Sequence, residues 1–142
     1  MRITFKDCVV KKRIFYFKSS KHLIKPEPEE AVSDLSTAEK EFSESGFKWA
    51  TVKAYYSMFH SARALLYSRG YREKGHFCLY LAIKELFVKE NKLDSSLVEA
   101  FNTGMILREE ADYKRTFSEK SASAIIKSAG KFLKAAKAIL KA

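Results

Sequence analysis

Two arginines stand at helix positions where the surrounding pattern favours apolar side chains. Between residues 49 and 66, large apolar side chains recur at helical spacing, at Trp49, Val52, Tyr56, Phe59 and Leu66, but the residue one turn before Leu66 is Arg63. Between residues 97 and 111, the same spacing brings Arg108 onto the apolar face. Because a guanidinium stays charged, such a position requires a fixed acceptor or a hydrated cleft. The pattern predicts a polar site between helices.

The residue types around these arginines suit phosphate chemistry. A guanidinium binds two phosphate oxygens at once and can stabilise the charge of a phosphorane. A histidine can take the proton of a 2′-hydroxyl group, and His60 lies three residues before Arg63. We therefore take His60 and Arg108 as candidate catalytic residues. The expected binding residues are Arg63, Arg108, Asp112, Tyr56, Tyr113, Lys74 and His76.

The same residues also have a purely structural interpretation. Arg108 would pair with Asp112 one turn further on, or Arg63 would pair with Asp112 across helices. His60 would then be a hydrogen-bonded core residue, and His76 the first residue of a helix. In the functional alternative, His76 contacts a phosphate together with the free N–H groups of that helix. The sequence leaves both interpretations open.

Metal and cofactor chemistry find no support in the sequence. The three histidines lie on separate predicted elements, and no pair of them has the spacing of metal ligands. There is no glycine-rich phosphate loop. We expect no metal and no cofactor.

The sequence favours a soluble cytoplasmic protein without membrane contact. It has no apolar run of about 18 residues and no signal-peptide pattern. Cys8 and Cys78 share no redox or metal motif and stand far apart. We therefore expect two free thiols in a reducing compartment.

The positive charge of the chain is concentrated at its two ends. The net charge is +10; residues 1–25 hold eight lysines and arginines against Asp7, a sum of +7, and residues 119–142 hold six lysines against Glu119, a sum of +5. Basic ends favour contact with a polyanion such as RNA or with an acidic protein face, although lysines on a solvent-facing helix also serve solubility.

The hydrophobic periodicity predicts an all-α protein. Residues 1–25 form a basic N-terminal arm with a short helix or strand, and Pro26 and Pro28 mark the boundary to a helical unit over residues 26–142. The expected helices cover residues 27–45, 47–69, 76–90, 96–113 and 118–140, with a loop over residues 70–75. The aromatic side chains of the second helix, Trp49 among them, are expected in the core. The architecture is an antiparallel up-and-down four-helix bundle with an additional helix.

Three short motifs resemble the small single-domain prokaryotic branch of the HEPN-domain family. They are Ala-Tyr-Tyr-Ser-Met-Phe-His (54–60) with Ala-Arg-Ala-Leu-Leu (62–66), Gly-Tyr-Arg-Glu-Lys-Gly-His (70–76), and Leu-Arg-Glu-Glu-Ala-Asp-Tyr (107–113). Together with the amphipathic C-terminal helix, the resemblance covers about residues 27–141. It implies a helical bundle that is often a homodimer, and a minimal nucleotidyltransferase as a frequent partner.

Many proteins that this chain resembles are metal-independent ribonucleases. Their motif is an arginine followed after four to six residues by a histidine. Arg108 matches the arginine, but the corresponding window holds Tyr113, Lys114 and Arg115 instead of a histidine. We therefore expect a module that binds a nucleotide, RNA or a nucleotidyltransferase partner, as one half of a toxin–antitoxin pair. The alternatives are a ribonuclease toxin that uses His60, and a structural subunit without catalysis.

Overall fold

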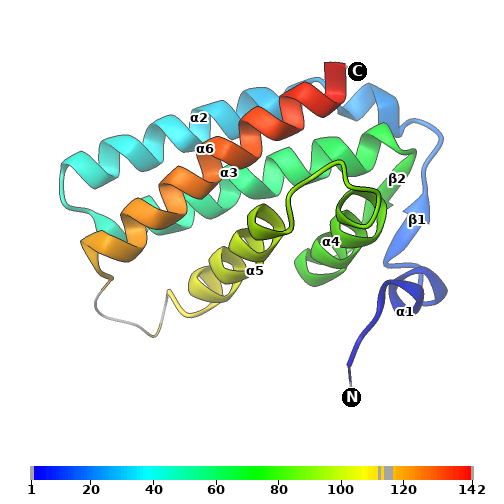
Figure 1. Ribbon diagram of the computed structural model, residues 1–142, viewed down its shortest axis with the longest axis horizontal. Coiled ribbons are helices and arrows are strands. Elements are labelled where there is room, and N and C mark those ends of the chain that lie inside the picture. The colour runs from blue at the N-terminus through cyan, green and yellow to red at the C-terminus, as the bar shows by residue number, and fades with distance from the viewer. Residues whose placement is uncertain (1, 112, 114–116, 142) are drawn as a thin grey trace.

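Three long helices run side by side and form the frame of the molecule (Figure 1). The computed structural model describes residues 2–111, 113 and 117–141. The long helices are α2 (Pro26–Ser43), α3 (Phe47–Ser68) and α6 (Glu119–Lys141). Two shorter helices, α4 (His76–Ile83) and α5 (Ser95–Glu109), pack against this layer, and α4 continues into the π-helical turn η2 (Lys84–Val88). The predicted all-α bundle is confirmed.

Helix α3 forms the centre of the core because it is apolar or small on almost every side. Fourteen of its 22 residues are buried, as expected for a helix enclosed by others. Against α2 the approach is close: Ala31 and Ala38 are fully buried, and the Ser57 hydroxyl donates a hydrogen bond of 2.8 Å to the Ala31 carbonyl. Helix α6 covers another side with the predicted apolar face, whose buried residues include Ile125, Phe132 and Leu133.

The expectation that Trp49 lies in the core is wrong. Its side chain is 53% exposed, and the Lys48 ammonium lies 5.0 Å from its ring centroid. Trp49 lies near the end of α5 at Glu109, where it lines a cavity together with Arg108 and Ala111. The last turn of α5 brings Arg108 beside Tyr56 but leaves a cavity next to Trp49. Periodicity identifies the apolar side of a helix, but it does not show where the neighbouring helix stops.

The N-terminal arm contains both a helix and a strand, and the strand pairs with the segment expected to be a loop. The arm comprises α1 (Phe5–Val10), β1 (Ile14–Tyr16) and the 3₁₀ turn η1 (Ser20–Leu23). Strand β1 pairs antiparallel with β2 (Tyr71–Glu73), with Phe15 opposite Arg72. Gly70 and Gly75, at φ 86° and 97°, provide the left-handed turns on either side of β2. A three-residue strand is too short to show an alternating pattern, so the sequence could not reveal this pairing.

The expectation of two free thiols is also wrong, because Cys8 and Cys78 form a disulfide. The bond joins α1 to α4, and both cysteines are buried. The two cysteines are 70 positions apart in the sequence, and no sequence pattern indicated that they lie together. The disulfide and the strand pair both attach the arm to the bundle. In the part of the chain that the structure describes, no helix combines the length and hydropathy needed to cross a membrane.

Helix α5 packs closely on α3 at Gly104, which gives a test of this packing. A Cβ atom at Gly104 would lie 3.2 Å from Met58 Cε and 3.2 Å from Tyr55 Cδ1. The fully buried Tyr55 ring is held by its neighbours, so we expect Gly104→Ala to destabilise the fold by about 1–3 kcal/mol. Urea denaturation measures this change. The matched control is Gly130→Ala in α6, where the nearest atom is 4.0 Å away, and where alanine should stabilise by up to about 1 kcal/mol. Equal effects at the two positions would contradict the close packing of α5 on α3.

Candidate functional site

Arg63 finds its acceptors on two elements that the sequence did not connect to it. Its guanidinium lies 3.6 Å from a carboxylate oxygen of Glu27 on α2 and 3.3 Å from one of Glu73 on β2. The guanidinium carbon also lies 5.2 Å from the centroid of the Phe59 ring and 5.4 Å from that of Tyr67. Burial raises the pKa of Glu73, and the charge of Arg63 opposes this shift. Arg63 is thus paired within the protein. Its expected contact with Asp112 lies outside the described residues.

His60 faces α2. Its Nδ1 lies 2.5 Å from Glu27 Oε2, and its Nε2 lies 3.5 Å from Asp34 Oδ2. Asp34 also lies 3.7 Å from the Lys53 ammonium. Both ring nitrogens therefore contact carboxylates of the same helix. In the described contacts, His60 is joined to Arg63 through Glu27 and makes none with Arg108.

Arg108, on the last turn of α5, lies against two tyrosine rings of α3. Its guanidinium carbon is 5.6 Å from the Tyr55 centroid and 6.0 Å from the Tyr56 centroid. A cation over an aromatic face is attracted by the ring, most strongly where water is excluded. The Nε atoms of Arg108 and of Arg63 are both buried without a hydrogen-bond partner among the described residues, but only Arg63 has ion pairs there. Asp112, the expected partner of Arg108, again lies outside the described residues.

His76 stands between the two arginines as the first residue of α4, as the sequence predicted. Its Nδ1 is hydrogen-bonded to the Tyr55 hydroxyl, and its ring stacks on Phe59 with centroids 4.5 Å apart. Burial, followed by the charges of Arg108 and Arg63, lowers the pKa of His76. The ring is therefore uncharged at neutral pH. Its Nδ1 can then accept a hydrogen bond from the Tyr55 hydroxyl, with the ring proton on Nε2. Burial also raises the pKa of Tyr55, which keeps that hydroxyl protonated.

A cavity of about 340 Å³ opens beside Arg108, a size at the lower end for small-ligand sites. Of the residues predicted for the site, Tyr56 and Arg108 line it; the complete lining is Trp49, Val52, Lys53, Tyr56, Arg108 and Ala111. Trp49 and Lys53 are functional candidates that the sequence did not single out. An exposed tryptophan cannot be distinguished from a core tryptophan by its spacing alone.

Two other predicted site residues lie apart from this cavity. Lys74 is exposed, with its ammonium 5.6 Å from the Phe15 ring centroid of the strand pair. Tyr113 is 86% exposed. Neither residue lines the cavity. The predicted residues thus fall into three groups. Arg108 and Tyr56 line the cavity, Arg63 is held in ion pairs, and Lys74 and Tyr113 are exposed.

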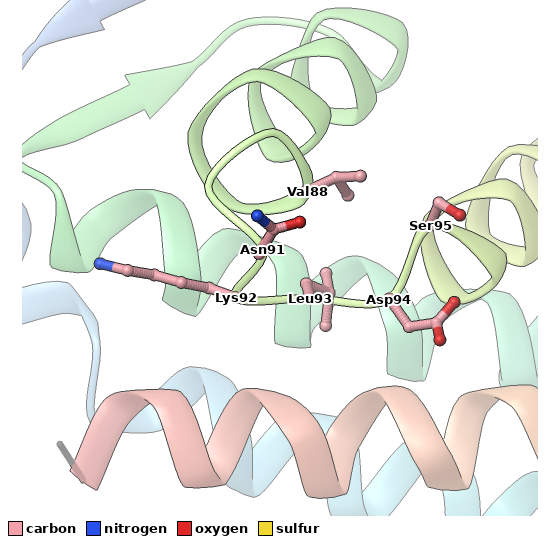
Figure 2. Close-up of a pocket in the computed structure, with 6 residues that line it drawn as sticks. All are labelled: Val88, Asn91, Lys92, Leu93, Asp94 and Ser95. Carbon is pink, nitrogen blue, oxygen red and sulfur yellow. The ribbon is translucent and has the colours of Figure 1, made fainter.

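A second cavity, of about 400 Å³, lies at the loop between η2 and α5 (Figure 2). It is lined by Val88, Asn91, Lys92, Leu93, Asp94 and Ser95. Asp94 accepts a hydrogen bond from the Ser96 amide and so caps α5, and Lys92 pairs with Glu90. The charged side chains of this loop are therefore engaged in local structure.

Across the described residues, no group of three or more histidine, cysteine, aspartate or glutamate side chains is arranged to hold a metal ion.

Comparison with known proteins agrees with this architecture. The family model described as the HEPN domain matches residues 28–139. Two proteins of Methanocaldococcus jannaschii are similar to the chain. Putative toxin MJ0142 is 31% identical over 96 residues, which are 68% of this chain and 65% of that protein, just under two thirds of its length. Putative toxin MJ0605 is 32% identical over 112 residues, which are 78% of this chain and 84% of that protein. The chain belongs to the HEPN domain family.

Proposed function

We propose that this HEPN protein binds a nucleotide, either free or as one unit of an RNA, in the cavity beside Arg108. The observation that carries the proposal is the Arg108 guanidinium, which lies over Tyr55 and Tyr56 at the cavity wall with a buried Nε that no described residue accepts from. A phosphate oxygen would provide that acceptor, since a guanidinium presents a fork of donors that fits a phosphate.

The distribution of charge supports an external anion at Arg108. The charge of Arg63 is matched by Glu27 and Glu73 within the protein. The ion pairs of the described residues include none for Arg108. The Lys48 ammonium, 5.0 Å from the Trp49 ring centroid, adds positive charge beside one of the residues that line the cavity. A phosphate there would be held by charge-assisted hydrogen bonds, which are about twice as strong as neutral ones.

The aromatic side chains of the cavity suit the base of the same nucleotide. Trp49 lines the cavity with more than half of its side chain exposed, and Tyr56 lines it beside Arg108. A base can stack on such a ring with a gain of about 1–3 kcal/mol and little dependence on its identity. The cavity therefore offers one surface for a phosphate and another for a base.

The expected effect of losing Arg108 is a large loss of nucleotide affinity. Calorimetric titration with a nucleoside monophosphate should show at least about tenfold weaker binding for Arg108→Ala, because a hydrogen bond to a charged group contributes about 1.5–3 kcal/mol. The affinity of Arg108→Lys should lie between those of the unmodified chain and Arg108→Ala, since lysine keeps the charge but lacks the forked donors of the guanidinium. The matched control is Arg69→Ala, whose guanidinium also lies over a ring, that of Phe87 at 4.5 Å, but at the C-terminal end of α3. Unchanged affinity in Arg108→Ala would refute the proposal.

A second candidate function is a ribonuclease toxin: the two relatives are described as putative toxins, and the family resemblance implies the ribonuclease chemistry. A ribonuclease needs a general base, and the candidate histidines are already engaged in other contacts. Both ring nitrogens of His60 contact carboxylates, and Nδ1 of His76 is bonded to Tyr55. This candidate predicts growth arrest on expression of the chain, with Arg108→Ala and His60→Ala both abolishing it. If Arg108→Ala alone abolishes toxicity and the purified chain cleaves no RNA, the binding function remains.

We also propose a homodimer that binds a nucleotidyltransferase partner, as the family resemblance implies, and that acts in the cytoplasm, as expected from the sequence. Exposed apolar side chains at Trp49 on α3 and Ile106 on α5 would support such contacts. Size-exclusion chromatography with light scattering tests the dimer, and co-purification with the product of a neighbouring gene tests the partner. A monomer that co-purifies with no nucleotidyltransferase would contradict both.

A further inference from the structure

We propose that the outer face of the β1–β2 strand pair binds the backbone of single-stranded RNA. The outer face consists of Phe15, Phe17, Arg72 and Lys74. The inference rests on the proposed function, because it supplies a second contact surface for the RNA whose nucleotide enters the Arg108 cavity. It adds the substrate class, a strand longer than one nucleotide, and a role for the basic arm.

The register of the two strands places aromatic rings and cations on one side. Phe15 lies opposite Arg72, and side chains two residues apart on a strand share a face. The contacts run diagonally: the Arg72 guanidinium lies 5.3 Å from the Phe17 ring centroid, and the Lys74 ammonium lies 5.6 Å from that of Phe15. The outer face is therefore an alternation of two rings and two cations.

The opposite face of the strand pair meets the bundle at Ile14 and Glu73, whereas Tyr16, at the end of β1, is 72% exposed. Ile14 is 1% exposed, and the Glu73 side chain is paired with Arg63. The acid of β2 thus points toward the bundle, away from the cations of the outer face. Among the described residues, the ion pairs do not include Arg72 or Lys74. The cations of the outer face therefore form no ion pair among the described residues, although the Arg72 charge also acts on the neighbouring Glu73 carboxyl.

The arm increases this positive charge. Residues 1–25 carry a net +7, and their one acid, Asp7, accepts hydrogen bonds from Thr4 as part of the cap of α1. The disulfide and the strand pair hold this basic segment against the bundle. Clustered lysines and arginines bind phosphates through release of counterions, with an affinity that falls as salt rises. The charge of the arm is complementary to a polyphosphate strand.

The rings indicate why the partner is a single strand. Surfaces for unpaired nucleic acid combine cations along the backbone with aromatic rings on which bases stack. In a duplex the base faces are occupied by neighbouring bases, so the rings of the outer face would contribute nothing. An acidic protein would use the cations but not the ring faces. The alternation of rings and cations therefore favours single-stranded RNA.

The outer face and the Arg108 cavity are too far apart for one nucleotide to reach both. Tyr56 lies beside the cavity and Ser68 ends α3 just before β2. Twelve residues of helix separate them, or about 18 Å along the axis. A mononucleotide can thus report on the cavity alone, whereas an oligomer can report on both surfaces.

The test measures the binding of a fluorescently labelled oligouridylate of about ten nucleotides, a typical site size for such surfaces, by anisotropy over a range of salt. The variant Arg72→Gln/Lys74→Gln should bind at least about tenfold more weakly, with a log–log salt slope shallower by about 1.4, the value for two lost single-strand contacts. The matched control is Lys127→Gln/Lys131→Gln, two exposed lysines of α6, which should change affinity less than about twofold. Phe15→Leu/Phe17→Leu keeps every charge and should also weaken binding.

The possible outcomes bear differently on the outer face and on the Arg108 cavity. If the α6 control and the outer-face variant weaken binding equally, the interaction is general charge attraction and the outer face is not a site. If a duplex or an acidic peptide binds better than the single strand, the proposed partner is wrong. If the outer-face variant loses the oligomer while Arg108→Ala does not, the outer face is retained and the Arg108 cavity fails. If both variants bind mononucleotide and oligomer as the unmodified chain does, both proposals fail.

Discussion

Reduction of the Cys8–Cys78 disulfide should lower the free energy of unfolding by about 4 kcal/mol. The bond closes a loop with a sequence separation of 70 residues, and the chain-entropy model assigns a loop of this length a stabilisation of about 4 kcal/mol. The effect acts on the unfolded chain, which gains conformational freedom when the bond is cut. Urea denaturation with and without a thiol reductant measures the difference.

The control for this experiment is the variant Cys8→Ser/Cys78→Ser, whose unfolding should not respond to the reductant. In that variant, the strand pair still holds the arm through bonds such as the one from the Lys74 amide to the Arg13 carbonyl. Amide exchange should therefore accelerate most in the arm and least in α3. A reduced protein as stable as the oxidised one would show that the disulfide does not constrain the chain.

Replacement of Arg63 by methionine should cost about 3 kcal/mol at neutral pH. The side chains of Arg63, Glu27 and Glu73 are only 21%, 12% and 7% exposed. Removing one member of a buried ion pair leaves a charge without compensation, at a cost of about 3–5 kcal/mol. We expect the lower end of this range because Arg63 keeps some contact with water. Urea denaturation at several pH values measures the change.

The pH dependence of this loss has a definite sign. Burial already raises the pKa of Glu73 above its ordinary value of 4.5, and loss of the opposing Arg63 charge raises it further. A carboxyl with a raised pKa in the folded state reduces stability as the pH rises through that pKa. The deficit of Arg63→Met should therefore be larger at pH 7.5 than near pH 5, and Arg63→Met/Glu73→Gln should recover part of it.

The matched control for the Arg63 prediction is an exposed pair. Lys89 lies 2.7 Å from Glu85, with side chains that are 70% and 33% exposed. Lys89→Met should cost less than about 1 kcal/mol, the usual worth of a surface pair. A similar loss in both variants, or a loss in Arg63→Met that does not change with pH, would mean that Arg63 is not a buried partner of Glu73.

The bundle could be predicted from the sequence because helices are encoded by local periodicity. The apolar face of α6 and the mainly apolar and aromatic sequence of α3 are visible within windows of a few turns. Each starts and ends within about two residues of the expected positions. Helix α5 was expected to reach Tyr113 but ends at Glu109, and the cavity beside Trp49 is lined by Arg108 and Ala111 at this end of the helix.

The partners across the bundle could not be predicted. Arg63 was expected to need a fixed acceptor or a hydrated cleft; its acceptors, Glu27 and Glu73, lie 36 residues before it and ten after it, on other elements. The disulfide and the β1–β2 pairing are likewise contacts between distant segments. Spacing within one helix shows that a charge faces inward; the residue that meets it depends on how the helices are packed.

The most direct measurement is a titration of the fluorescence of Trp49, the single tryptophan of the chain, with a nucleoside monophosphate. Because this indole lines the cavity beside Arg108, a bound base should change its emission in a saturable manner. We expect Arg108→Ala to shift the midpoint at least about tenfold, while Arg69→Ala leaves it unchanged. Emission that changes only in proportion to concentration, or a midpoint that Arg108→Ala does not move, would contradict nucleotide binding at this site.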